Sequence, residues 1–274
     1  MARLLHTTRR REHSMKLENK NVVITGAALG MGGTITRQLA AEGANLVLVA
    51  RTPEPLEKLA EELKAAGTRA LALPCDVTDE ERVKNRFAEV TDFFDGRIDV
   101  LINAAGATGP IETPVWKIMG EEFESLLRKN IVGTFLPMKY AIPSMIEHRY
   151  GKIVNIGGGS GMKGYRYRAG YSSSKWGVRG LTRTAALDCG EHNINVNAIM
   201  PGIVETPRME KLCHEKAKTK GTSYEQEYAD YVAEMALKRV TTPQDIANAV
   251  VFLACDDSKN ITGQEMVICG GWAV

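Results

Sequence analysis

The chain has 274 residues, of which 44% are hydrophobic and 25% are charged. These ordinary globular values exclude wholesale disorder, and no apolar run approaches the roughly 20 residues that span a bilayer. The net charge of +2 hides an imbalance, because residues 1–14 hold four arginines and one glutamate. The remaining chain is close to neutral, which gives no electrostatic reason to bind nucleic acid or an anionic membrane.

The amino-terminal segment differs from the rest. Residues 1–14 show neither an apolar period nor a long apolar stretch, so we expect no secretory signal. We expect a disordered basic tail, with a short mitochondrial presequence as the alternative, and one folded domain over 15–274. The five cysteines are odd in number and form no C-x-x-C pair. We therefore expect no disulfide framework, no metal site, and reduced thiols in the cytoplasm.

Short apolar runs alternate with helical patterns along the chain. The first strand is expected at 21–25, before a helix at 31–42, and the second at 45–50, before a helix at 53–66. Further strands are predicted at 69–73, 98–102, 151–156 and 194–199, with helices near 79–93, 121–148, 170–190 and 243–254. Continuous apolar strands between helices predict a parallel sheet covered on both faces. With right-handed crossovers, this gives a single-domain, doubly wound α/β fold that is Rossmann-like.

One segment breaks this alternation. Residues 207–240 are polar, rich in Lys and Glu, and inserted between a predicted strand and the helix at 243–254. We interpret them as a lid, although a charge run is also typical of a solvated helical face.

A glycine-rich loop follows the first strand. Thr25–Gly32 reads TGAALGMG, which places Gly26, Gly30 and Gly32 between a strand and a helix. Glycine lets a pyrophosphate approach the backbone, and the helix N-terminus offers free N–H groups and a positive dipole end. In this strand–loop–helix context the loop predicts dinucleotide binding.

Several motifs occur together in an order that resembles the short-chain dehydrogenase/reductase family. Besides the glycine loop, the chain contains an N-A-A-G segment preceded by Ile102 where the family has a second asparagine. The other matching motifs are Asn130 in KNIVGTF, the Y-x-x-x-K pair Tyr171 and Lys175, Pro201-Gly202 with Thr206, and Ile261–Gln264 with Gly270-Gly271. The resemblance extends from about Lys16 to Val274.

The resemblance implies that a nicotinamide dinucleotide binds along these motifs. The cofactor-binding residues it implies are Gly26, Leu29, Gly30, Met31, Gly32, Arg51, Asp76, Val77, Asn103, Ala104, Gly106, Tyr171, Lys175, Pro201, Gly202, Val204 and Thr206. Asp76 and Val77 correspond to the family's adenine contact.

Tyr171 and Lys175 are four residues apart, so they share one face of a helix. A free phenol has a pKa near 10, and a neighbouring ammonium favours the phenolate and lowers that value. The resemblance makes Tyr171 the general acid/base, gives Lys175 the ribose hydroxyls, and gives Asn130 a water in a proton relay.

One family position is missing. The family has a serine thirteen residues before the tyrosine, where this chain has Gly158. We hypothesise that Ser160 replaces it as the donor to the substrate oxygen. A backbone N–H, Tyr165 or Tyr167, or a hydroxyl of the substrate itself are the alternatives.

The end of the second strand bears on cofactor choice. An acidic residue there would bind the ribose diol, but this chain has Ala50, followed by Arg51. Arg51 suits a 2′-phosphate, so we favour NADP over NAD.

The substrate is indicated only weakly. Lys163, Arg166 and Arg168 lie where the family lines its substrate pocket and suit a carboxylate, phosphate or sulfonate, or simply face solvent. With the polar lid, they favour a small polar substrate (a polyol, a sugar-like compound or a hydroxy acid). The expected activity is hydride transfer between a nicotinamide and a secondary alcohol/ketone pair. A weakly active nucleotide-binding regulator or scaffold and a 3-oxoacyl thioester reductase are the alternatives. The long helices at 121–148 and 170–190 resemble those of family homotetramers, and we expect that assembly.

Overall fold

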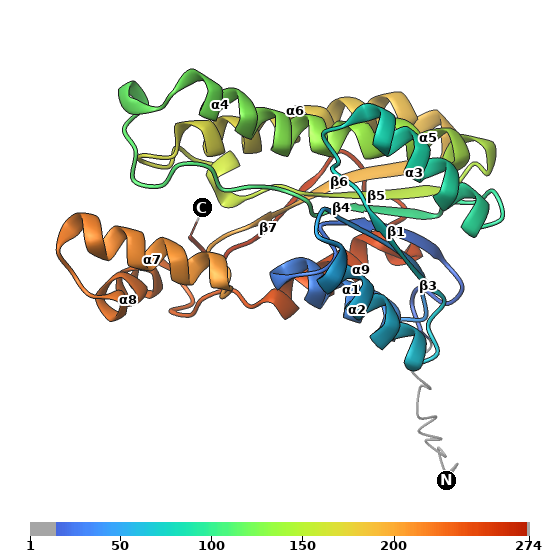
Figure 1. The fold of residues 1–274 in the computed structure, drawn as a ribbon, viewed down its shortest axis with the longest axis horizontal. Helices are drawn as coiled ribbons and strands as arrows, with labels where there is room; N and C mark the ends of the chain where they lie inside the picture. Colours follow the sequence, from blue (N-terminus) through green and yellow to red (C-terminus); the bar gives the residue numbers. More distant parts are fainter. Residues whose placement is uncertain (1–14, 273–274) are drawn as a thin grey trace, which may run out of the picture.

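Seven parallel strands form one sheet in this computed structural model, which describes residues 15–272. The strand order is β3-β2-β1-β4-β5-β6-β7 (Figure 1). The strands are β1 Asn21–Thr25, β2 Asn45–Ala50, β3 Ala70–Pro74, β4 Val100–Asn103, β5 Gly151–Ile156, β6 Ile194–Pro201 and β7 Glu265–Ile268. The chain order reverses between β1 and β4, which is where ligands bind in sheets of this type.

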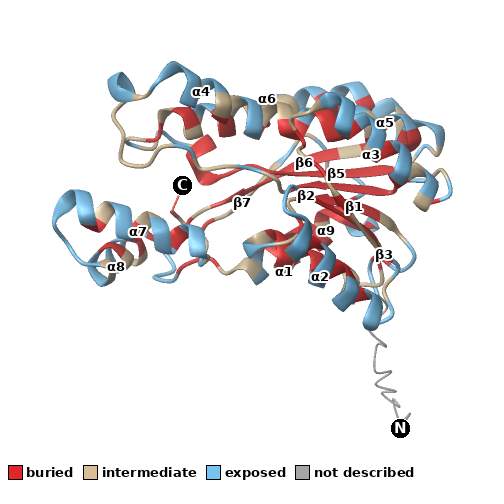
Figure 2. Ribbon diagram, in the orientation of Figure 1, coloured by how far each residue is buried: buried red, intermediate tan, exposed pale blue. Residues whose placement is uncertain are grey.

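Helices cover both faces of the sheet, as Figure 1 shows. One face carries α1 Gly30–Ala41, α2 Pro53–Ala65 and α9 Pro243–Ala254. The other carries α3 Glu80–Phe93, α5 Gly133–Glu147 and α6 Ala169–Cys189, with α4 Gly120–Leu127 beside α6. Figure 2 shows buried residues on both faces of the sheet and on the facing sides of these helices. The predicted doubly wound α/β fold is confirmed.

The strand predictions held to within about two residues, except that β7 was missed. Its four residues are all half-buried at the edge of the sheet, and only three of them, Met266–Ile268, are apolar, so the run is shorter than those of most central strands. It pairs with β6, from Ala198 opposite Glu265 to Pro201 opposite Ile268.

The helix predicted at 121–148 was wrong as a single element. The structure has α4, a π-helical turn at Arg128–Val132, and then α5. A π-helical turn holds an extra residue, which hydrophobic periodicity does not reveal, and such turns are frequent at functional sites. Asn130 is the buried residue of this turn.

The polar segment at 207–240 folds as two helices, α7 Pro207–Lys220 and α8 Tyr224–Glu234. We refer to them as the lid helices. They pack on each other around an apolar cluster of their own that includes Met209, Cys213 and Tyr231. Figure 1 shows them beyond the carboxyl ends of the strands, away from the helices that cover the sheet.

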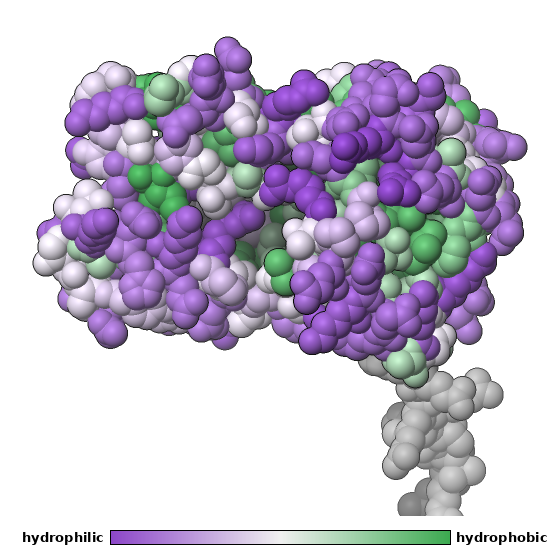
Figure 3. All heavy atoms as spheres, in the orientation of Figure 1, coloured by the Kyte–Doolittle hydropathy of each residue, from purple (hydrophilic) through white to green (hydrophobic). Residues whose placement is uncertain are grey.

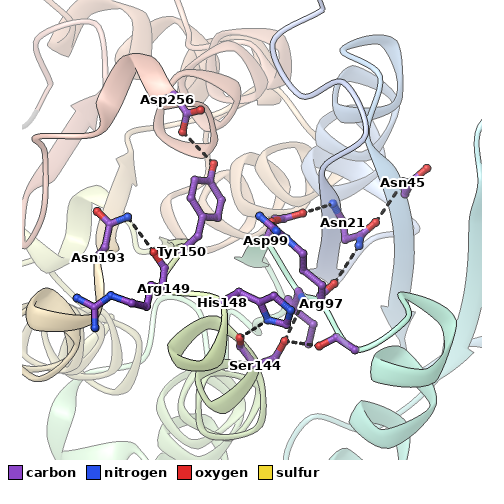
Figure 4. Close-up of polar contacts among 12 residues, drawn as sticks. Asn21, Asn45, Arg97, Asp99, Ser144, His148, Arg149, Tyr150, Asn193 and Asp256 are labelled. Carbon is purple, nitrogen blue, oxygen red and sulfur yellow. Dashed lines mark hydrogen bonds and ion pairs between the residues drawn. The ribbon is translucent and has the colours of Figure 1, made fainter.

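The amino-terminal end of the sheet has a network of polar contacts (Figure 4). Asp99 accepts a hydrogen bond from the Asn21 backbone N–H at 3.0 Å and one from Arg97 Nε at 2.7 Å. On α5, Ser144 Oγ donates to the Gly96 carbonyl at 2.8 Å and accepts from the Ile98 N–H at 3.0 Å. These contacts anchor α5 to the start of β4.

The predicted tail at 1–14 lies outside the described residues. Between residues 15 and 272, no helix combines the length and apolar character needed to cross a membrane. All five cysteines are buried thiols. The same part of the chain has no group of three His, Cys, Asp or Glu side chains arranged to hold a metal ion.

Candidate active site

A cleft of about 610 Å³ opens at the carboxyl ends of the strands, beside β1 and β4, where the chain order reverses. Figure 3 shows the surface hollowed between the lid helices and the body. Two segments meet in the cleft, the glycine loop on one side and the start of α6 on the other. Of the predicted site residues, the following line it: Gly26, Leu29, Gly30, Met31, Gly32, Arg51, Asp76, Val77, Ala104, Gly106, Ser160, Tyr171, Lys175, Pro201, Gly202, Val204 and Thr206.

The glycine loop forms a cradle that side chains would fill. Gly26 has φ +68°, and a Cβ there would lie 2.7 Å from the Ala105 nitrogen. A Cβ on Gly32 would lie 1.9 Å from the Gly26 carbonyl oxygen. No side chain caps the first turn of α1, so its N–H groups are available to a ligand. This bare, positively polarised helix start fits a pyrophosphate.

The opposite end of the nucleotide half contains Arg51 and Asp76. Asp76 Oδ1 accepts hydrogen bonds from the Thr78 N–H at 2.9 Å and from Thr78 Oγ1 at 2.8 Å. Burial raises the pKa of Asp76, but these two bonds and the charges of Arg51 and Lys129 outweigh burial and lower it. Asp76 is thus an ionised acceptor beside a guanidinium.

Tyr171 and Lys175 project from the first turns of α6 into the cleft. Lys175 is 5% exposed, and its Nζ lies 5.7 Å from the centre of the Tyr171 ring while donating to the Ile156 carbonyl at 3.0 Å. Ile156 ends β5, so the helix and the strand together fix the ammonium beside the phenol.

Burial raises the pKa of Tyr171, because it disfavours the phenolate. The charges of Lys175, Arg208 and Arg168 outweigh burial, so the net effect is a pKa below the ordinary value. The pKa of Lys175 is lowered as well, first by burial and also by Arg208, against the opposing effect of Tyr171. The site therefore favours a tyrosine able to exchange protons at lower pH than a free phenol.

Asn130 and Asn103 lie behind the cleft wall and do not line it. Asn130 Oδ1 accepts from the Ala107 N–H at 2.7 Å, while its Nδ2 donates to the Ala107 carbonyl at 3.0 Å and to Ser174 Oγ at 2.8 Å. Asn103 Nδ2 donates to Asn155 Oδ1 at 2.9 Å, between β4 and β5. Asn130 therefore holds the backbone next to Gly106, whereas Asn103 links β4 to β5.

The position of the missing family serine has room for a side chain. A Cβ on Gly158 would lie 3.4 Å from Tyr171 Oη and 3.7 Å from Ser160 Oγ. Ser160 is 4% exposed, lines the cleft, and its hydroxyl has no hydrogen-bond partner in the described chain. A buried hydroxyl without a partner, directed at this position, is available to a ligand.

Sequence reasoning missed several residues of the substrate half. Arg208 follows Pro207 at the start of α7, and its Nη2 donates to the Gly106 carbonyl at 3.2 Å. Trp272 and Thr108 also line the cleft. The placement of Arg208 depends on how the lid helices fold back, and no local pattern reveals that.

A nucleotide cradle beside a tyrosine–lysine pair, at the switch point of a parallel sheet, defines an oxidoreductase of the dinucleotide-binding class. The family model described as enoyl-(acyl carrier protein) reductase matches residues 26–273. The chain is 35% identical to the 3-oxoacyl-[acyl-carrier-protein] reductase of Thermotoga maritima, over 95% of this chain and 100% of that protein. It is 33% identical to the D-beta-hydroxybutyrate dehydrogenase of Rhizobium meliloti, over 92% and 98%.

Among solved structures, NAD+-bound xylitol dehydrogenase superposes with a TM-score of 0.89 at 34% identity, covering 93% of this chain and all of the other. The chain belongs to the short-chain dehydrogenase/reductase family, as its motifs predicted.

Proposed function

We propose that the protein moves hydride between NADP(H) and a small polar secondary alcohol/ketone pair, with Tyr171 as general acid/base. The observation that carries this proposal is the placement of Tyr171 and Lys175 in one cleft with the glycine cradle of α1. A bound nicotinamide supplies the hydride donor or acceptor.

Tyr171 handles the proton of the reaction. In alcohol oxidation its phenolate accepts the hydroxyl proton, and in ketone reduction its phenol returns a proton to the carbonyl oxygen. Lys175 stabilises the phenolate and also holds the ribose hydroxyls, the role that its family position implies. Ser160 Oγ donates to the substrate oxygen from the position described beside Gly158, which orients the reacting carbon.

Asn130 acts through the backbone. Its side chain holds both polar groups of Ala107, and its backbone carbonyl accepts from Thr134 Oγ1 at 2.8 Å. The π-helical turn keeps this residue in place between Gly106 and Ser174, which supports its proposed role in a water-linked relay behind Lys175.

Arg51 supports NADP as the preferred cofactor. It lines the cleft at the end of β2, where Ala50 leaves no carboxylate to repel a 2′-phosphate. A guanidinium pairs with phosphate through its planar fork.

A 3-oxoacyl thioester reductase is the second candidate, favoured by the 35% identity to the Thermotoga maritima reductase. It is tested in the same assays with an acyl thioester in place of the small ketone. A weakly active regulator would bind the cofactor but would reduce neither the small ketone nor the acyl thioester.

Further proposals concern assembly and location. Large apolar side chains are exposed on α5 and α6, including Phe135, Trp176 and Leu187, the last 84% exposed. We propose that these side chains pack against one another in a homotetramer. We also propose a cytoplasmic location, because five buried thiols suit a reducing compartment.

The decisive experiment follows nicotinamide absorbance with each cofactor against polyols, hydroxy acids, ketones and acyl thioesters. Tyr171→Phe should lower kcat by about 10²–10⁴, because it removes the general acid/base. Tyr140→Phe is the matched control, since that hydroxyl lies on α5, outside the cleft, and donates to Glu80 at the start of α3. Tight cofactor binding without turnover of any substrate would favour the regulator.

A further inference from the structure

Three cations surround the reacting tyrosine. The Arg168 guanidinium carbon lies 4.8 Å from the centre of the Tyr171 ring, and Lys175 Nζ lies 5.7 Å from it. Arg208 contributes a hydrogen bond and a charge that favour the phenolate. Within residues 15–272, no carboxylate lies in ion-pair distance of any of the three.

Arg168 is a buried cation with an incomplete set of hydrogen-bond partners. It is 4% exposed and stands at the N-cap of α6, where the helix dipole opposes a positive charge. Its Nη2 donates to the Thr108 carbonyl at 3.0 Å, but its buried Nε has no hydrogen-bond partner among the described residues. A buried charge is normally paired, so the arrangement lacks an anion.

The two other basic residues of the same loop are placed differently. Lys163 Nζ donates to the Trp272 carbonyl at 2.7 Å, and Arg166 is exposed with its guanidinium 4.8 Å from the Tyr167 ring. Neither lines the cleft, whereas Arg168 and Arg208 both do. The positive charge in the substrate half therefore comes from two particular arginines on two different elements.

We propose that Arg168 and Arg208 form a subsite for an acid group of the substrate, a carboxylate or a sulfonate, next to the carbon that exchanges hydride. The inference rests on the proposed function and narrows its substrate to small oxo acids and hydroxy acids. Arginine suits this role because its fork donates two parallel hydrogen bonds to such oxygens. The place of Arg168 three residues before Tyr171 sets the acid group close to the reacting carbonyl.

The wall around the two arginines is largely apolar. Apolar side chains complete the substrate half of the cleft: Ile111, Tyr165, Ile203, Leu212 and Trp272. A short, uncharged carbon chain between the carbonyl and the acid group suits this wall. Such a chain places no further charged group of the substrate against apolar side chains.

The kinetic test uses three ketones of similar shape: 3-oxobutanoate, 2-oxopropane-1-sulfonate and the neutral 3-oxobutanamide. We expect kcat/KM to be about 100-fold higher for at least one acid than for the amide, because charged hydrogen bonds are strong. In Arg168→Gln and Arg208→Gln this ratio should fall at least about tenfold. Any effect exerted through Tyr171 cancels in the ratio, because all three ketones use it.

Arg166→Gln is the matched control, two residues away on the same loop, and should leave the ratio unchanged. An amide used as well as both acids, or a ratio unaffected by either variant, would overturn the subsite while leaving the oxidoreductase intact. A preference for only one acid identifies the chemistry of the substrate.

A binding test separates the subsite from the reaction. Calorimetry of 3-hydroxybutanoate, propane-1-sulfonate and 3-hydroxybutanamide with the NADPH-loaded enzyme needs no hydride transfer. We expect either acid to bind at least about tenfold more tightly than the amide, and to lose that advantage in Arg168→Gln. Acid binding without turnover of any ketone would overturn the proposed function alone. Equal binding of all three, or no binding, would overturn the subsite.

Discussion

The two ends of the sheet treat buried polar groups in opposite ways. At the amino-terminal end, Asp99 and Ser144 each hold two hydrogen bonds from or to the protein (Figure 4). At the carboxyl end, Ser160 Oγ and Arg168 Nε are buried without a partner in the described structure. At the amino-terminal end, Asp99 joins the segment before β4 to β1, and Ser144 joins it to α5. At the carboxyl end, these two polar groups are available to a ligand. Substitutions at the amino-terminal end should therefore lower stability, and substitutions at the carboxyl end should lower activity.

The glycine cradle offers the strongest effect on cofactor binding. Gly32→Ala places a Cβ 1.9 Å from the Gly26 carbonyl, which is backbone that cannot move aside cheaply. We expect the dissociation constant for NADPH to rise by about 100-fold or more, because a shift of about an ångström at a binding loop carries this order of cost. Fluorescence titration measures it.

Gly180→Ala is the control for this substitution. It also lies in a helix, but a Cβ there meets nothing within 4 Å, so the change should stabilise α6 by about 0.5–1 kcal/mol. Equal cofactor affinity in the two variants would show that the cradle does not hold the pyrophosphate.

The two buried serines test the contrast between the ends directly. Ser160→Ala should lower kcat by about 10²–10³, as the loss of an oxyanion-type donor does. Its free energy of unfolding should stay level or increase, since a hydroxyl without a partner is removed. Restored turnover in the double variant Gly158→Ser, Ser160→Ala would confirm the position of the donor. Undiminished turnover in Ser160→Ala would show that the Ser160 hydroxyl is not the donor to the substrate oxygen.

Ser144→Ala should do the reverse. It leaves the Ile98 N–H unsatisfied near the amino end, so the free energy of unfolding should fall by about 1–3 kcal/mol. Urea unfolding measures this loss, and kcat/KM should match that of the wild type. A drop in activity without a drop in stability would contradict the division between the two ends.

Cofactor discrimination is a smaller effect. Arg51→Ala should raise the dissociation constant for NADPH by about 10–100-fold, which is the contribution of a charge-assisted contact. The dissociation constant for NADH should be nearly unchanged. Paired titrations with both cofactors measure it. Equal loss for the two cofactors would point to a role of Arg51 in packing and not in 2′-phosphate binding.

The smallest effect is a displacement of the pH profile. Arg208 lowers the pKa of Tyr171, so Arg208→Gln should raise it. Alcohol oxidation needs the phenolate, which forms as pH rises through that pKa, so the rising limb of kcat should move to higher pH. A limb at the same pH would show that another group titrates in this reaction.

The sequence predicted the nucleotide half of the site far better than the substrate half. Gly26, Gly32 and Tyr171 belong to local motifs, in which spacing along one strand, loop or helix determines the geometry. Arg168 and Arg208 are forty residues apart in the chain, and they line one cleft only because the starts of α6 and α7 both face it. No periodicity encodes that encounter.

The same reasoning explains the errors in the fold. The central strands are continuous apolar runs because both of their faces are buried, and such runs are visible in one dimension. Strand β7 is a short, half-buried edge strand with an apolar run of only three residues. The turn at Arg128–Val132 adds one residue to a helix, which leaves no distinct apolar pattern.

The glycines beside the active site differ in how freely they can be replaced during evolution. A Cβ on Gly157 would lie 2.3 Å from Met200 Sδ, and one on Gly159 would lie 2.8 Å from the Trp272 ring, whereas Gly158 has ordinary contact distances. Its φ of 171° is extended backbone that any residue adopts. A glycine codon of the GGU or GGC type becomes a serine codon by a single base change. Packing therefore leaves a serine at 158 within easy mutational reach, and steric constraint does not explain the glycine found there.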